Sequence, residues 1–379
     1  MTSFKFLIKN WLKDVDWILL LSVIPVVFFG LITMYSFVSD NNLFSRQVIW
    51  FILSICAFFI FTSFDFKFLK NTQVVFWIYL FAVGLLASLF FTGSTFKGAR
   101  SWIDFGIFAF QPVDFAKIAL ILILAKYFSR RHIEIKNIRH IIVSGVYALV
   151  LFALVGIQPD FGSAILIFLI WFGMVFVSGI SKKHLLMVFV VGITSFLIMW
   201  NFVFMDYQKD RIKTFLDPLH DIQGAGYNAY QSMITVGSGQ IFGKGIGYGT
   251  QSRLKFLPEY QTDFIFAAFA EEWGFFGVIL LFSCYGILIF RILYNSLSFQ
   301  SNFESLFAIG LAILFSSHFI IHVGMNVGLL PVTGLNLPFM SYGGTSLLFS
   351  FISLGILNSM RKNSKNVRRN LSDTEIVGF

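Results

Sequence analysis

Ten long apolar segments, separated by short polar ones, dominate this sequence of 379 residues. A helix that crosses the hydrocarbon core of a bilayer needs about 20 mainly apolar residues, and an open irregular chain cannot cross it. Hydrophobic residues make up 57% of the chain and charged residues 12%, which is more apolar side chain than a soluble core buries. The sequence therefore predicts an all-α integral membrane protein. The expected transmembrane helices are 17–38, 48–64, 73–92, 113–128, 140–157, 162–179, 185–204, 264–293, 303–329 and 338–360.

The positions of the basic residues predict the orientation of the chain in the membrane. An even number of spans places both termini on one side, and short cytoplasmic loops carry an excess of Lys and Arg. Most of the 28 Lys and Arg residues lie in the termini and in the loops on their side. Both termini are therefore expected in the cytoplasm, and the eighth segment is long enough to include a bent helix before its true span.

One membrane domain, residues 1–361, accounts for nearly the whole chain. Within it, residues 3–14 show apolar side chains at helical spacing and lysines on another face, which predicts a helix lying on the membrane surface. The polar tail, 362–379, is expected to be disordered. The net charge of +9 is scattered over short loops, which indicates anionic lipid headgroups and excludes nucleic acid as the main partner. Cys56 and Cys284 both fall inside predicted spans, so no disulfide framework is expected.

A long loop joins the seventh and eighth spans, at residues 205–262. Loops of this length in compact domains are usually functional or disordered. Its many glycine and aromatic residues permit tight backbone turns around a ligand, so the sequence predicts a functional loop.

Ionisable residues gather on the same side of the membrane as this loop. Asp114 and Lys117 stand three residues apart near the end of a span, which places them on one helical face. A charge near the middle of the membrane costs about 2.5–3.5 kcal/mol on insertion scales, so such residues line a polar cavity or form pairs. The alternative is an ion pair that only joins helices. A binding site is favoured because further charged residues share this face: Arg46, Arg100, Asp160, Arg211, Lys244 and Asp263.

Three short patterns suggest other functions, and each fails on inspection. Residues 237–245 resemble a phosphate-binding loop but lack its Ser or Thr after the lysine, and 247–249 resemble part of a potassium filter, which a tetramer of small pore units would require. His318 and His322 are spaced as metal ligands on a helix, yet no carboxylate or Cys lies near them in the sequence. Hydrogen-bonded, helix-packing histidines are the favoured interpretation.

A series of longer motifs follows in a fixed order along the chain. Together they resemble the SEDS family of cell-wall polymerases over nearly the whole sequence. The motifs lie at 98–103, 110–112, 116–117, 158–164, 215–218, 226–228, 231–232, 257–259, 262–267, 271–272, 331–334, 337–339 and 341–346. One departure concerns Asp114, which stands where the family usually has Glu, so the carboxylate is kept on a shorter stem.

The resemblance implies a peptidoglycan glycosyltransferase of the bacterial cytoplasmic membrane, with its active face on the outer side. Such an enzyme polymerises lipid II into glycan strands during cell elongation, on an undecaprenyl diphosphate carrier and beside a class B penicillin-binding protein. An α-linked donor and a β-linked product require one inverting displacement, with a base for the acceptor hydroxyl. Asp263, at the junction of the long loop and the eighth span, is the expected base. Its alternative role is the N-cap of that helix.

The remaining candidate residues follow from charge and from the matched motifs. Basic side chains are expected to hold the departing diphosphate, because Arg offers a planar fork and Lys a compact charge. These are Arg46, Lys117, Arg211 and Lys244, with Arg100 as a weaker candidate. Asp114 and Asp160 would orient these cations or ligate a divalent ion such as Mg²⁺ or Mn²⁺, although no dedicated ligand spacing is present. Gln231, Ser232 and Glu259 are expected to contact substrate, and Glu271 and Glu272 to brace the outer loop.

Two other functions are compatible with the same residues. A flippase or transporter of lipid II would also need intramembrane charges and a lipid-sized cavity. A scaffold that only docks and activates a penicillin-binding protein would need neither a base nor a substrate site. The motifs also leave open whether the chain serves elongation or division.

Overall fold

The structure is a computed structural model that describes residues 14–36, 41–96, 99–106, 109–130, 138–179, 181–202, 206–217, 226–254 and 256–377. Within the described residues, ten long helices overlap the apolar segments, so the prediction of an all-α membrane protein is confirmed. Seven of them are long and apolar enough to cross a membrane, and α7 is a shorter apolar helix. The long helices are α2 (Trp17–Ser36), α3 (Asn41–Ser63), α4 (Thr72–Thr92), α5 (Pro112–Ser129), α6 (Ile138–Ile157), α7 (Phe161–Val177), α8 (Lys182–Phe202), α12 (Ile265–Ser298), α13 (Asn302–Asn326) and α14 (Gly344–Val377).

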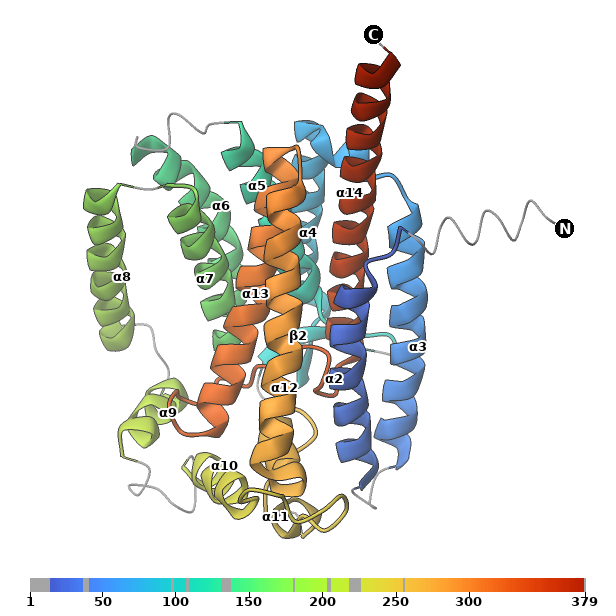
Figure 1. Ribbon diagram of the computed structural model, residues 1–379. Helices are drawn as coiled ribbons and strands as arrows, with labels where there is room; N and C mark the ends of the chain where they lie inside the picture. The colour runs from blue at the N-terminus through green and yellow to red at the C-terminus, as the bar shows by residue number, and fades with distance from the viewer. Residues whose placement is uncertain are drawn as a thin grey trace, which may run out of the picture.

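The long helices run side by side as a bundle, as Figure 1 shows. The short helices α9 (Asp206–Leu216), α10 (Tyr227–Ser238) and α11 (Thr250–Arg253) lie together at one end, and the C-terminus lies at the other. Helix α8 stands to one side of the bundle, and none of its apolar window is buried. In a membrane protein such a surface faces lipid.

Helix α5 lies at the centre of the bundle, and nearly all of its residues are buried. It packs against α4, α7 and α13. Glycine permits the closest of these approaches: a Cβ atom added at Gly310 of α13 would lie 2.5 Å from the Ile121 side chain of α5. Small residues serve the same purpose at many helix contacts in membranes, where backbones approach closely.

A small sheet between α4 and α5 was not predicted. Strand β1 (Ser94–Phe96) pairs antiparallel with β2 (Ala99–Asp104), which pairs antiparallel with β3 (Ala109–Phe110). The strands have two to six residues, too short to give a clear alternation of apolar and polar residues. The sheet precedes α5 directly and so lies next to its first turn, where Asp114 is found.

The two ends of the chain differ in how they compare with the predictions. The expected surface helix at 3–14 lies almost entirely outside the described residues. Where a disordered tail was expected, α14 continues to Val377, beyond the rest of the bundle (Figure 1). No Gly or Pro occurs between Gly355 and Gly378, so the sequence contains no residue that would end the helix at the membrane surface. The last apolar segment also becomes helical only at Gly344, after turns at residues 338–343.

The long outer loop and the helix after it are tightly connected. Helix α12 bends at Gly274, whose φ of 64° and ψ of −166° are not helical, and a bend before the true span was predicted for this segment. A Cβ atom at Gly274 would lie 2.2 Å from the Gly243 backbone nitrogen, so only glycine fits this contact. Phe275 and Phe276, just after the bend, donate backbone hydrogen bonds to Gln240 and Ile241. The bend thus provides the backbone groups that hold the loop.

Candidate active site

Asp263 lies where the outer loop enters the membrane bundle. The turn before it is set by Glu259, whose φ of 52° is in the left-handed region. The Glu259 carbonyl accepts the N–H groups of Thr262 and Phe264, both at 3.2 Å. Helix α12 begins after Phe264, which is its N-cap. The alternative role of Asp263 as the N-cap is therefore not supported, because the helix begins one residue too late.

The backbone around Asp263 is fixed from two sides. From α13, Asn326 donates its Nδ2–H to the Asp263 carbonyl at 3.1 Å. From the turns before α14, the Ser341 hydroxyl donates to the Thr262 carbonyl at 2.8 Å, and the Tyr342 N–H donates to Gln261 at 2.9 Å. These bonds join three segments that are distant in sequence, so the Cα of Asp263 has little freedom to move.

The Asp263 side chain is half-buried and lies beside a strap of chain that we define as residues 333–336. An added Cβ at Gly334, whose φ is 72°, would lie 3.8 Å from Oδ2 of Asp263. The strap is tied to α13: Nδ1 of His322 bonds the Leu335 carbonyl at 2.7 Å and Nδ1 of His318 bonds the Asn336 carbonyl at 3.2 Å. The interpretation of these histidines as hydrogen-bonded packing residues is confirmed.

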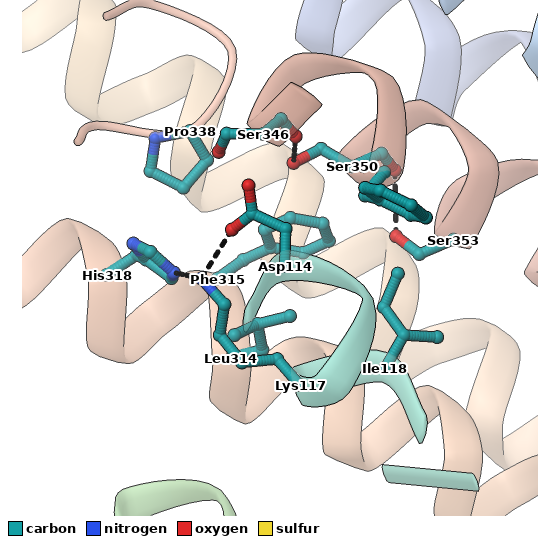
Figure 2. Close-up of a pocket in the computed structure, with 11 residues that line it drawn as sticks. Asp114, Lys117, Ile118, Leu314, Phe315, His318, Pro338, Ser346, Ser350 and Ser353 are labelled. Atoms are coloured by element: carbon teal, nitrogen blue, oxygen red, sulfur yellow. Dashed lines mark hydrogen bonds and ion pairs between the residues drawn. The ribbon is translucent and has the colours of Figure 1, made fainter. Parts of the chain in front are cut away.

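The pair predicted at Asp114 and Lys117 is present and buried. Their side chains are 6% and 5% exposed, and Lys117 Nζ lies 2.7 Å from Asp114 Oδ1. Lys117 Nζ also lies 3.4 Å from Nε2 of His318. Figure 2 shows the three side chains pointing toward one another from α5 and α13. Since Nδ1 of His318 faces a carbonyl, the hydrogen bonds assign its proton to Nδ1 and leave Nε2 to accept from Lys117.

A cavity borders this pair on the side of α14, with Ser346 and Ser350 on its wall (Figure 2). Its volume is about 20 Å³, which is room for about one water molecule. Asp114 Oδ2 is buried and has no hydrogen-bond partner among the described residues. The pair thus joins α5 to α13 through His318, and the small cavity lies beside the buried Asp114 carboxylate.

Glu271 binds the outer loop through several hydrogen bonds. Its carboxylate accepts from Lys244 Nζ at 2.8 Å, from the Gln251 N–H at 3.0 Å and from the Ser252 hydroxyl at 3.0 Å. The Glu271 side chain is fully buried, while that of Lys244 is 28% exposed. Lys244 is thus engaged inside the protein, and any diphosphate would have to compete with Glu271 for its ammonium group.

Glu272 extends the same brace to α2. Its Oε1 accepts from the Ser36 hydroxyl at 2.5 Å and from the Gly247 N–H at 2.9 Å. The backbone adds a further hydrogen bond, because Gly245 donates its N–H to the Glu272 carbonyl at 3.0 Å. The two glutamates therefore hold the loop against the bend of α12, which is the position expected for loop support.

Arg46 and Arg211 do not line the cavity beside the buried pair. Arg46 is exposed on α3 and Arg211 is exposed on α9. Arg100 lies in β2, and its side chain is outside the described part of the structure. Asp160 caps α7 by accepting the Ser163 N–H at 3.0 Å, so it stabilises the helix start. Among the described residues, no group of three His, Cys, Asp or Glu side chains is placed to hold a metal ion.

The polar residues expected to contact substrate have partners within the protein. Gln231 of α10 bonds the side chain of Gln251. Ser232, fully buried, donates its hydroxyl to the Asn326 carbonyl at 2.9 Å. Glu259 is exposed and accepts the Thr262 hydroxyl at 3.0 Å. Gln231 and Ser232 therefore serve to place α10 against its neighbours.

Sequence reasoning missed three residues that frame Asp263: Gln47, Asn326 and Ser341. Gln47 of α3 donates to the Ser341 carbonyl at 3.2 Å and accepts the Gly343 N–H at 3.3 Å. All three are buried amide or hydroxyl side chains in apolar surroundings. A polar side chain in apolar surroundings was the signal that could have identified them, because buried polar groups are nearly always hydrogen-bonded.

Comparison with known proteins is consistent over almost the whole chain. Residues 14–366 match the family described as cell cycle protein, which is named for FtsW, RodA and SpoVE. The chain is 38% identical to the peptidoglycan glycosyltransferase MrdB of Escherichia coli K12 over 301 residues, 78% of this chain and 80% of that protein. It is 32% identical to the probable peptidoglycan glycosyltransferase FtsW of Bacillus subtilis over 384 residues, 96% of this chain and 95% of the relative.

Solved structures give the same result. A structure of a peptidoglycan synthase complex, described as coordinating polymerisation and crosslinking, matches with a TM-score of 0.80 and 29% identity over 92% of this chain and 98% of that one. The rod shape determining protein RodA of Thermus thermophilus matches with a TM-score of 0.70 and 27% identity over 92% and 97%. The chain therefore belongs to the SEDS family of FtsW, RodA and SpoVE proteins, and it is a member close to RodA.

Proposed function

We propose that this protein is a peptidoglycan glycosyltransferase that polymerises lipid II into glycan strands during cell elongation, with Asp263 as the general base. The activity rests on relatives that are named peptidoglycan glycosyltransferases over most of the chain. The role of Asp263 rests on one structural observation. Its backbone is held by α13 and by the turns before α14, while its side chain stays partly exposed at the end of the outer loop.

A fixed carboxylate with partial access to solvent suits proton transfer. The acceptor hydroxyl of the sugar loses its proton to the Asp263 carboxylate as its oxygen attacks the anomeric carbon of the donor. The bond from that carbon to the diphosphate breaks, and the diphosphate leaves with the electron pair. A positioned base contributes about 10²–10⁴-fold to such a step. A backbone held at both neighbours keeps that base in the required geometry.

The leaving diphosphate requires positive charge on the outer face. We assign this role first to the exposed side chains of Arg46 and Arg211, since both reach solvent. Lys244 and Lys117 are secondary, because their side chains are less exposed. Arg100 completes the set that the sequence suggests.

We further propose that both termini lie in the cytoplasm of a bacterial cell and that the end carrying α9, α10 and α11 faces outward. The basic residues of the short loops and of the tail support this orientation. As a working partner we propose a class B penicillin-binding protein. The similarity to a peptidoglycan synthase complex that couples polymerisation to crosslinking supports this assignment.

The experiment combines the purified full-length protein, a class B penicillin-binding protein with an inactivated transpeptidase, and fluorescent lipid II. Glycan strands are separated on a gel. Asp263→Asn is expected to remove strand formation, whereas Asp210→Asn, which deletes a carboxylate paired with Lys213 on α9 of the same loop, should retain it. Equal purification yield and melting temperature of both variants serve as the folding control.

Each rival function predicts a different outcome. A flippase would move lipid II across proteoliposome membranes, and Asp263→Asn would leave that transport unimpaired. A scaffold would support its partner with every outer-face charge neutralised. Strand formation by Asp263→Asn at the wild-type rate would reject the assignment of the base.

A further inference from the structure

The start of α12 has a cap that comes from another helix. The first N–H groups of any α-helix lack partners within the helix, and the side chain of the N-cap residue usually accepts one of them. The N-cap of α12 is Phe264, which has no side-chain acceptor. The Ala267 N–H, the third of the helix, instead donates to Oδ1 of Asn326 at 3.2 Å. Asn326 therefore performs from α13 the function that an Asp or Ser next to the helix normally performs.

The amide nitrogen of Asn326 contacts the backbone of the proposed base. Its Nδ2 donates to the Asp263 carbonyl at 3.1 Å and to the His322 carbonyl, one turn back in α13, at 2.8 Å. The second bond fixes the direction of the amide plane, so Oδ1 must face α12. The side chain is fully buried, which keeps water from replacing either contact.

The local sequence explains why Asn326 can reach so far. It is the last residue of α13, and Gly328, with a φ of 77°, turns the chain away two residues later. An added Cβ at Gly328 would lie 2.4 Å from Sδ of Met233, so α10 packs directly on this turn. Ser232 of α10 then bonds the Asn326 carbonyl at 2.9 Å. Asn326 thus lies where α10, α12 and α13 meet.

From these contacts we infer that Asn326 is a positioning residue for Asp263: it caps α12 in place of a nearby carboxylate and fixes the Asp263 backbone with the same amide group. The Ala267 N–H is thus satisfied from the neighbouring helix and not by a residue that precedes α12 in the sequence. The inference rests on the proposed function of Asp263 as the base.

Two substitutions separate the contributions of Asn326. Asn326→Ala removes both contacts, while Asn326→Asp retains an oxygen that can accept from Ala267. The matched control is Asn295→Ala: Asn295 is also a buried Asn in this bundle, but it bonds Asp16 at the opposite end of α12. It reports what the loss of a buried amide does when Asp263 is not involved.

The measurements are kcat and KM for lipid II with the partner present, and hydrogen exchange of the amides at 264–268. We expect Asn326→Ala to lower kcat about 100-fold, the size expected from a displacement of about 1 Å, with KM changed less than about threefold. Exchange at Ala267 should accelerate in the same variant. Asn326→Asp should keep the protection of Ala267 without recovering kcat, because a carboxylate cannot donate to the Asp263 carbonyl. Asn295→Ala should leave kcat and the exchange at 264–268 unchanged.

The inference is overturned if Asn326→Ala exposes the Ala267 amide and yet keeps the wild-type kcat, or if Asn295→Ala lowers kcat as much. Asp263→Asn is measured in parallel to separate this result from the proposed function. If that variant stays active, the base assignment fails, and the cap is then judged by the exchange of Ala267 alone. Unchanged exchange at Ala267 in Asn326→Ala would reject the cap itself.

Discussion

Glu271→Ala is expected to release the segment 244–252 of the outer loop from α12. The carboxylate is fully buried and accepts the N–H groups of Gln251 at 3.0 Å and Ser252 at 3.3 Å. A buried donor left without an acceptor costs about 1–3 kcal/mol, so the two amides together give about 2–6 kcal/mol. The ion pair with Lys244 adds at most about 1 kcal/mol, because that side chain is partly exposed and screened by solvent.

The assay for this prediction is hydrogen exchange of the detergent-solubilised protein, followed by mass spectrometry of peptides that cover 244–252. An opening free energy lower by about 2–6 kcal/mol corresponds to exchange that is faster by a factor of about 30 or more, up to the rate of an unfolded chain. Glu271→Gln should show a smaller effect, since it keeps one acceptor oxygen and the shape of the side chain.

The matched control is Glu304→Ala, which removes another buried carboxylate paired with a lysine, Lys70, at the opposite end of the bundle. It should leave the exchange of 244–252 unchanged. The reasoning is refuted if Glu271→Ala also leaves this exchange at the wild-type rate. In that case the hydrogen bonds of Glu271 would not be what holds the loop.

Two further predictions concern the bundle and the bend of α12. Lys117→Met should lower the free energy of unfolding by about 3–5 kcal/mol, because it leaves the buried Asp114 carboxylate unpaired. Adding Asp114→Asn to the same chain should recover most of this loss. A double variant that is no more stable than Lys117→Met would contradict this. Gly274→Ala should lower the free energy of unfolding by more than the roughly 1–3 kcal/mol that its backbone conformation costs, since the added Cβ would meet the Gly243 nitrogen at 2.2 Å. Gly286→Ala, which has open space around it in the same helix, should be neutral or stabilising in thermal unfolding. Equal melting temperatures of the two variants would contradict this.

The helices were predictable because the bilayer imposes a simple requirement on the sequence. Each span must satisfy its own backbone hydrogen bonds, and a long apolar run is the direct consequence. The length of the eighth apolar segment predicted a bend before the true span of α12, but it did not identify Gly274 as the residue at which the helix bends. The small sheet at 94–110 escaped prediction because its strands are too short to show a period. The helical continuation of α14 was not predicted, because polarity alone does not decide between helix and disorder.

The candidate site was predictable in its chemistry and less so in its geometry. The pairing of Asp114 with Lys117 followed from their spacing on one helix. The link to His318 did not, because it depends on how α5 packs against α13. Lys244 illustrates the limit most clearly. Its charge suggested a diphosphate contact, yet Glu271, 27 residues later in the chain, engages it in the folded protein.

Asn326 shows what a single sequence hides. No local motif marks an asparagine that caps a helix beginning some sixty residues earlier in the chain. The cap exists only because α12 and α13 lie antiparallel and side by side, which brings the end of one to the start of the other. Long-range hydrogen bonds of this kind become visible only with the fold.

The central claim, that the Asp263 carboxylate takes the proton in glycan transfer, is tested most directly by a single-turnover measurement with lipid II bound beforehand. Asp263→Asn keeps the size of the side chain and loses the basic oxygen pair. We predict a transfer rate lower by about 100-fold or more, as expected for loss of a general base, with lipid II affinity within about threefold of wild type. A transfer rate within tenfold of wild type would contradict the account.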